Sequence, residues 1–215
     1  MRIKQYMRCT RKETQLDTLK VENMQIDQVR SFSYLGATVN GNNTLEEEIK
    51  ERTVKGNKAF YANKTLFKSK LVSRKSKLKL YWSVIRPIVV YGCKTWVLKE
   101  STIQRLSVFE RKILKKISGP TNEDNSIWRI KTNKELDEYI KHWNIINYVK
   151  AQRLSWFGHV NRMPEISIVK KIYKWKPFTS TPVGRPKSPW EDNVRNDVKK
   201  MKLIKWTKQV QDCLI

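Results

Sequence analysis

Histidine, cysteine and carboxylate side chains are the first candidates for catalysis or metal binding. In this 215-residue chain, their spacing excludes most of the known kinds of site. Zinc sites need closely spaced Cys and His pairs, whereas His142 and His159 lie far from all three cysteines. No serine is framed by glycines as in a nucleophile elbow, and the seven glycines are too scattered to cradle a phosphate. We therefore predict no catalytic residue, no metal ligand and no cofactor.

A two-metal polymerase or nuclease site needs carboxylates that converge on ions about 4 Å apart. Most acids of this chain begin predicted helices, where the helix dipole favours them. Asp192, Asp197 and Lys199 faintly resemble the acid, acid, lysine pattern of some nucleases. That pattern belongs on adjacent strands, whereas this segment is predicted to be helical. We expect dipole and salt-bridge roles for these acids, with a nuclease as the alternative.

The charge of the chain is large and unevenly distributed. Forty-five Lys and Arg against 20 Asp and Glu give +25, which favours a polyanionic partner. From Lys50 to Arg86, twelve Lys or Arg accompany one acid, Glu51. The same segment carries five aromatic residues, Phe60, Tyr61, Phe67, Tyr81 and Trp82. A basic helical stripe with aromatic rings suits a nucleic-acid backbone, so we predict RNA, DNA or RNA–DNA duplex as the partner.

Membrane association and secretion are not expected. The longest apolar run, from Ile88 to Cys93, is too short for a membrane span of roughly 18 residues. Met1 to Thr10 has no apolar core of a signal peptide, and three distant cysteines form no disulfide framework. We predict an intracellular protein, in the nucleus or the cytoplasm, with no membrane partner.

The elements that must position the basic segment are mostly helical. Residues 1–29 favour short strands, and an aromatic strand over 31–36 is expected to continue through 37–39 to a turn at Asn40-Gly41. A helical stripe runs from Leu45 to about Lys70, with Gly56 on its buried face, where only a small side chain fits. A second helix begins after Ser73 and contains Pro87, which predicts a kink.

The remaining chain continues this pattern with helices over 101–118, 132–140 and 146–163. Residues 166–175 are β-branched and aromatic, which favours a strand. Residues 176–188 carry three prolines and are predicted to form an extended linker before a final helix that begins near Ser188.

Several motifs occur along the chain in a fixed order. They are Phe32-Ser-Tyr-Leu-Gly36, Glu47-Glu-Ile-Lys-Glu-Arg52, Gly56-Asn-Lys-Ala59, Leu80 to Gly92 followed by Trp96, Glu110 to Pro120, Arg153 to Met163 and Gly184 to Trp190. In this order they resemble the palm end, thumb and post-thumb region of non-LTR (LINE-type) retrotransposon reverse transcriptases. The resemblance covers about residues 20 to 200.

The resemblance implies a fold class and a division of the chain. The fold is expected to be mainly α, a thumb-like helical bundle with a small N-terminal β element and a short C-terminal helical subdomain. The expected segments are a palm-end β element (1–41), a thumb-like bundle (42–120), post-thumb helices (121–164) and a Pro-containing linker with a C-terminal helix (165–215).

The family's Tyr-x-Asp-Asp metal site lies upstream of the Phe-x-Tyr-Leu-Gly motif and has no counterpart here. The resemblance therefore implies a fragment that holds an RNA or RNA–DNA template–primer and is no enzyme on its own. The missing upstream polymerase portion is a further expected partner. Two alternatives stay open: a nuclease or polymerase subunit that is active with a partner in trans, and a decayed element product without a selected function.

Individual residues follow from the matched motifs. The primer-grip-like residues are Phe32, Tyr34, Leu35 and Gly36. Simple core packing is the alternative for Phe32, Tyr34 and Leu35. The expected nucleic-acid contacts are Arg52, Lys55, Lys58, Arg74, Lys75, Arg185 and Lys187. Of these, Arg52, Lys55 and Lys58 would lie on the thumb helix, whereas Arg185 and Lys187 lie in the Pro-containing linker.

Overall fold

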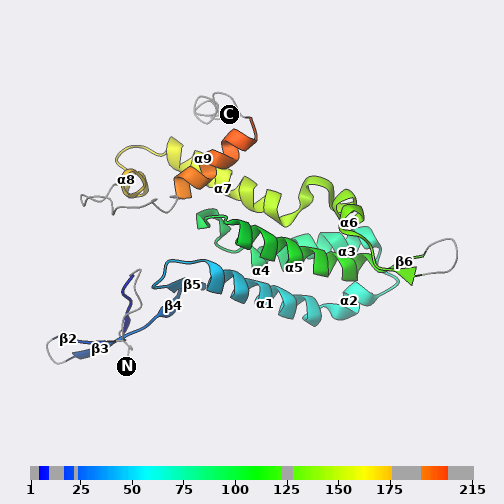
Figure 1. Ribbon diagram of the computed structural model, residues 1–215, viewed down its shortest axis with the longest axis horizontal. Helices are drawn as coiled ribbons and strands as arrows, with labels where there is room; N and C mark the ends of the chain where they lie inside the picture. Colours follow the sequence, from blue (N-terminus) through cyan, green and yellow to red (C-terminus); the bar gives the residue numbers. More distant parts are fainter. Residues whose placement is uncertain (1–4, 10–16, 22–23, 123–127, 176–189, 203–215) are drawn as a thin grey trace. The chain divides into compact units, whose positions relative to one another are not determined.

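The computed structural model describes residues 5–9, 17–21, 24–122, 128–175 and 190–202. These residues are mainly helical, with small strands toward the N-terminus, which confirms the predicted fold class (Figure 1). Residue contacts group the chain into two compact units. Unit 1 comprises residues 1–91 and 104–131, and unit 2 comprises 92–103 and 132–215. The four segments predicted from the motifs stay a prediction.

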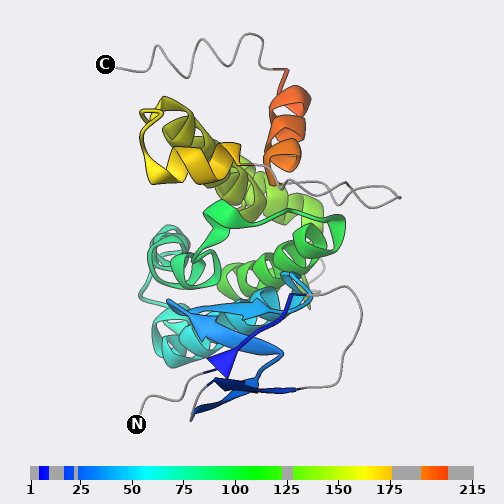
Figure 2. The same cartoon turned by 90° about the vertical axis from the view of Figure 1, so that its left-hand side faces the viewer.

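Unit 1 begins with two small β elements, visible in blue in Figure 2. Strand β1 (Gln5–Tyr6) pairs in parallel with β3 (Met24–Gln28), which also pairs antiparallel with β2 (Thr18–Val21). Strands β4 (Ser31–Tyr34) and β5 (Ala37–Asn40) form an antiparallel hairpin with Phe32 opposite Val39.

The hairpin corrects the expectation of a single strand running through Gly36. Leu35 and Gly36 both have positive φ, 49° and 77°, which reverses the chain between β4 and β5. Two consecutive residues with positive φ produce the tight turn whose twist suits a β-hairpin. The sequence pattern missed the reversal because leucine rarely adopts this conformation.

The helices of unit 1 pack around an apolar core. They are α1 (Glu46–Ala62), α2 (Lys64–Lys68), α3 (Arg74–Leu80), a π-helical segment (Tyr81–Ile85), α4 (Arg86–Val89) and most of α5 (Glu100–Ser118), followed by a small hairpin of β6 (Thr121–Asn122) and β7 (Trp128–Arg129). Ser73 caps α3, its side chain accepting a hydrogen bond from the Ser76 amide. The π-helical segment ends two residues before Pro87, where the sequence predicted a kink. Proline lacks the amide proton that a regular helix needs at this place.

Gly56 sets how closely α1 approaches its neighbours. A Cβ atom at this position would lie 2.4 Å from Val89 Cγ2 and 2.9 Å from Phe109 Cζ, both side-chain atoms of the core. The predicted need for a small residue is confirmed, because only glycine leaves room for the rings and methyl groups of α4 and α5.

Unit 2 contains a 3-10 turn (Cys93–Thr95), α6 (Asn133–Ile140), a 3-10 turn (Lys141–Trp143), α7 (Ile145–Arg162), α8 (Ile168–Lys174) and α9 (Trp190–Lys200). Thr132 and Glu135 form a reciprocal capping box at the start of α6. The strand predicted over 166–175 is wrong, since α8 occupies this segment. The predicted linker over 176–188 lies outside the described residues.

Side-chain contacts with α7 explain why α8 is a helix. Lys170 donates a hydrogen bond to the Asn161 carbonyl, and the Tyr173 ring meets the Phe157 ring edge to face, with centroids 6.3 Å apart. Residues three apart share one face of a helix but lie on opposite faces of a strand. Packing against α7 therefore overrides the β propensity of the segment.

Candidate nucleic-acid interface

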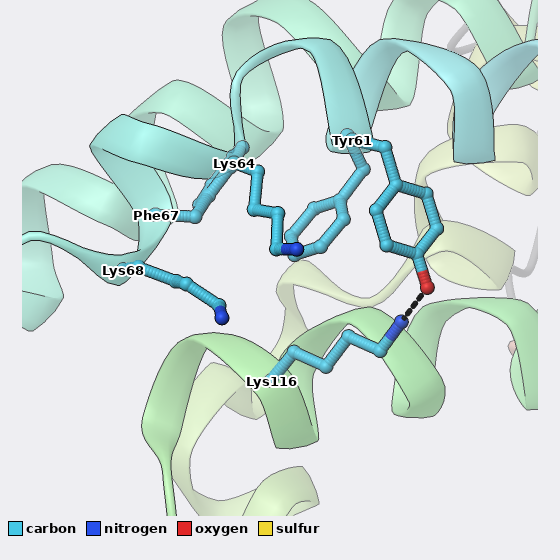
Figure 3. A pocket seen from close by; sticks show the side chains of 6 residues that line it. Tyr61, Lys64, Phe67, Lys68 and Lys116 are labelled. Atoms are coloured by element: carbon cyan, nitrogen blue, oxygen red, sulfur yellow. Dashed lines mark hydrogen bonds between the residues drawn. The ribbon is translucent and has the colours of Figure 1, made fainter.

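A pocket of about 290 Å³ lies in unit 1 where α1, α2 and the end of α5 meet (Figure 3). Its lining consists of three lysines and three aromatic residues, Phe60, Tyr61, Lys64, Phe67, Lys68 and Lys116. We call this site the α1–α5 pocket. Figure 3 shows the side chains of Lys64, Lys68 and Lys116 extending from different sides toward the same space.

The aromatic residues give the pocket a firm base. Phe60 and Phe67 are buried and stacked, with centroids 4.6 Å apart and an interplanar angle of 26°. Tyr61 meets Phe60 edge to face at 5.7 Å and 82°, yet remains 52% exposed. Such offset and edge-to-face pairs fix ring orientation. The Tyr61 ring is thus held against the core while much of it stays accessible.

Lys116 connects α5 to this aromatic group. Its Nζ donates a 2.6 Å hydrogen bond to Tyr61 Oη and lies 4.5 Å from the centre of the Tyr61 ring. The hydrogen bond and the charge of Lys116, with the charges of Lys112 and Lys64, lower the pKa of the Tyr61 phenol. An ammonium group stabilises the phenolate more than the neutral phenol, which explains the direction.

No carboxylate lines the α1–α5 pocket. Lys64 and Lys68 are exposed, and neither forms an ion pair within the described part of the chain. Three ammonium groups near one concave surface repel each other unless an anion lies between them. The pocket is therefore electrostatically suited to an anionic ligand.

Arg52, predicted to face a nucleic-acid backbone, is instead 6% exposed and bound inside unit 1. Its Nε pairs with Glu48 Oε1, its guanidinium donates to the Gly36 carbonyl, and it lies 4.5 Å from the centre of the Tyr91 ring. Tyr91 Oη in turn donates to the Leu35 carbonyl at 2.8 Å. Arg52 thus anchors the β4–β5 turn to the helices, and its charge is used internally.

The other predicted contacts differ in their surroundings. Lys55 is exposed and pairs with Glu51 at 3.5 Å, a surface pair of little stabilising value. Lys58 is exposed one turn before the pocket and has no ion-pair partner among the described residues. Arg74 and Lys75 are exposed in the first turn of α3. Arg185 and Lys187 lie outside the described residues.

The primer-grip-like residues lie on the β4–β5 hairpin. Phe32, Tyr34 and Leu35 are 38%, 61% and 76% exposed, so the alternative of core packing does not describe them. Two residues of α1 hold the hairpin: Glu48 accepts a hydrogen bond from the Thr38 amide, and Glu51 accepts one from the Thr38 hydroxyl. The hairpin is anchored through its backbone and Thr38, while its apolar side chains face outward.

Sequence reasoning did not single out the pocket residues as a site. Four of its aromatic and basic residues recur at helical spacing, Tyr61, Lys64, Phe67 and Lys68, a signal that the basic segment already contained. Lys116 lies more than fifty residues away in sequence, and only the packing of α5 beside α1 brings it to the pocket.

Of the two acids of the nuclease hypothesis, Asp197 is an ion-pair partner in unit 2. Asp197 accepts from Arg153 at 2.9 Å and lies 3.3 Å from Lys150, while Asp192 is exposed in the first turn of α9. Within the ranges that the structure describes, no three His, Cys, Asp or Glu residues are placed to hold a metal ion. Burial of Arg153 lowers its pKa, an effect that Asp197 opposes.

Taken together, these features define a strongly basic, mainly helical protein with an anion-suited aromatic pocket. The chain is 25% identical, over 182 residues and 81% of its length, to a protein of Caenorhabditis elegans named as an uncharacterized transposon-derived protein. The aligned part spans 62% of that protein. This similarity is consistent with a transposon origin of the chain.

Two further comparisons found nothing: no protein-family model and no solved structure matches the chain. In the described residues, no helix has the length and apolarity required to traverse a membrane.

Proposed function

We propose that this chain binds RNA or an RNA–DNA template–primer through the basic surface that α1, α2 and α5 form in unit 1. In this proposal it corresponds to the palm-end, thumb and post-thumb part of a non-LTR retrotransposon reverse transcriptase. The order of the sequence motifs supports the assignment, and so does the similarity to a transposon-derived protein. Copying of the bound strand would require the upstream polymerase portion as a partner.

The observation that carries the proposal is the α1–α5 pocket. Lysines from separate helices meet there beside accessible aromatic surface and no lining carboxylate. Phosphates satisfy the lysines, and bases are the natural partners of the aromatic rings. Lys58, exposed one turn earlier on α1, extends the same positive surface.

Fluorescence anisotropy with labelled 20-nucleotide RNA and with a matched RNA–DNA duplex tests the proposal on the full chain. We expect binding at low ionic strength that varies little with sequence. The logarithm of the association constant should fall linearly with the logarithm of salt concentration, with a slope of about 0.7 to 0.9 per phosphate neutralised.

A charge-matched pair of variants separates this surface from general charge. Lys64→Gln/Lys68→Gln/Lys116→Gln should weaken binding at least tenfold and reduce the salt slope by about two units. Lys171→Gln/Lys199→Gln/Lys200→Gln removes the same charge from exposed positions of unit 2 and should weaken binding less than threefold. Equal losses in both variants, or no binding by the unmodified chain, would overturn the proposal.

The alternative of an active subunit has its own measurement. The chain is incubated with Mg²⁺ or Mn²⁺, labelled primer–template and deoxynucleotides. We expect neither extension nor cleavage by the isolated chain. Cleavage that Asp197→Ala abolishes while the chain remains folded would instead support the nuclease hypothesis.

A further inference from the structure

We infer that the α1–α5 pocket binds one unpaired nucleotide, at the end of a duplex or in a single strand, by stacking its base on Tyr61. This inference rests on the proposed function and names the ligand of the same site. A nucleic acid would then contact unit 1 in two ways: its backbone along the lysines, and one exposed base in the pocket.

The size and shape of the pocket support a single nucleotide. Its volume of about 290 Å³ lies at the lower end of small-molecule sites, which start at about 300 Å³. A duplex presents its phosphates outward and keeps the faces of its bases covered by neighbouring bases. Only an unpaired or terminal base exposes a face that a protein ring can cover.

Tyr61 has the properties of a stacking platform. Phe60 supports its edge, the stacked Phe60 and Phe67 form the base of the pocket, and Lys116 fixes its hydroxyl group. A ring that is already oriented loses little conformational freedom when a base stacks on it. The accessible surface of Tyr61, a residue that is 52% exposed, is the part available to a ligand.

The lysines supply the second half of the recognition. Figure 3 shows Lys64 and Lys68 on the α2 side of the pocket and Lys116 on the α5 side. In a nucleotide whose base stacks on Tyr61, the phosphate lies one sugar away from the base, within reach of the flexible side chains of these lysines. An acidic peptide would satisfy the lysines but leave the aromatic surface unused, so the combination favours a nucleotide.

The test compares two duplexes of equal length and charge on the full chain, each closed at its other end by a non-nucleotide linker so that no loop base is unpaired. One is blunt, and the other has its last pair opened by a mismatch, with the fluorescent base 2-aminopurine unpaired at the end. We expect tighter binding of the opened end, by roughly five- to a hundredfold, which is the range for one stacked base. The 2-aminopurine fluorescence should be quenched on binding, because the base stacks on a ring.

Three variants assign the preference to Tyr61. Tyr61→Leu should weaken binding of the opened end much more than binding of the blunt duplex, so that the preference for the opened end is lost. Tyr61→Trp keeps an aromatic face and should restore the preference and the quenching. Tyr139→Leu removes an exposed tyrosine of unit 2 and should change neither. Because half of the Tyr61 side chain is exposed, Tyr61→Leu is expected to fold, which circular dichroism verifies.

The outcomes distinguish this inference from the proposed function. Equal affinity of the unmodified chain for both duplexes, or equal losses for both in Tyr61→Leu, would refute the nucleotide pocket and leave nucleic-acid binding intact. Failure to bind either duplex would refute the proposed function itself. Displacement of the opened duplex by a poly-glutamate peptide, with no displacement by a mononucleotide, would identify the pocket as a protein-binding site.

Discussion

Positive charge has opposite surroundings in the α1–α5 pocket of unit 1 and in the buried group of Arg153, Asp197 and Asn193 in unit 2. In the pocket, Lys64 and Lys68 are exposed with no carboxylate in the lining. In unit 2, the Arg153 side chain is 1% exposed, with Nη1 bound to Asp197 and Nη2 donating to Asn193 Oδ1.

This difference shows why a net charge of +25 does not locate a binding surface. Asn193 also joins Arg153 to the chain around Leu98, accepting from its amide and donating to its carbonyl at 3.1 Å each. The charge of Arg153 is therefore bound to partners inside unit 2, because buried charges must be paired and hydrogen-bonded. The pocket lysines are free of this constraint, so their charge is available to a ligand.

Removing the buried charge should have the largest effect on stability. Arg153→Met removes one of the two cations beside Asp197 and one hydrogen bond to Asn193, and we expect the free energy of unfolding to fall by about 3 kcal/mol. Urea denaturation followed by circular dichroism measures this change. Lys199→Met, at an exposed position of α9, is the control and should remain within about 0.5 kcal/mol. Equal stability of both variants would show that the fold does not depend on the buried charge of Arg153.

The second prediction concerns the packing of α1 against α4 and α5. Gly56→Ala places a methyl group 2.4 Å from Val89 Cγ2, which α1 can relieve only by moving away from α4 and α5. We expect a loss of about 2 kcal/mol in the free energy of unfolding, even though alanine favours helix. Thermal denaturation measures it, with Gln104→Ala on the exposed side of α5 as the control. A stabilised Gly56→Ala variant would show that α1 is not tightly packed.

The third prediction concerns a variant in which the pocket lysines gain a carboxylate partner, as Arg153 has in unit 2. Thr65 is exposed next to Lys64, so Thr65→Glu places a carboxylate beside the pocket lysines. We expect the affinity for single-stranded RNA to fall on the order of tenfold at low salt, with little change in stability. Thr65→Gln is the uncharged control. Anisotropy titrations that give equal affinities for both variants would argue against a role of the pocket charge.

The smallest expected effect is a pH dependence of binding. Because its neighbouring lysines lower the pKa of Tyr61, this phenol should become anionic at a lower pH than an ordinary tyrosine. Above that pKa the pocket contains one more negative charge, so the affinity for RNA should fall, on the order of twofold at this exposed site. The drop should be absent in Tyr61→Phe.

Ultraviolet difference titration of the unmodified chain against Tyr61→Phe measures the same ionisation directly. Lys116→Met removes the hydrogen bond and the nearest charge, and should move the Tyr61 pKa up toward its ordinary value. An unchanged titration in Lys116→Met would contradict the assigned cause.

Much of the local structure was predictable because its causes are local. The cap at Ser73, the capping box of Thr132 with Glu135 and the need for glycine at position 56 each follow from neighbouring residues or from helical spacing. The helix over 168–174 was not predictable in this way, since its β-branched residues favour a strand and contacts with α7 decide the outcome.

Some features of the candidate site were likewise predictable from the sequence, and others depend on the tertiary structure. Composition, charge pattern and hydrophobic periodicity alone determined that the chain is basic, that it is mainly helical, and that residues 50 to 86 carry twelve Lys or Arg against one acid. Only the tertiary structure decided that Arg52 turns inward to the carbonyl of Gly36 while Lys116 reaches Tyr61 from a distant helix. The physical reason is that charge is a property of each residue, whereas its availability depends on which groups the packing of distant segments places beside it.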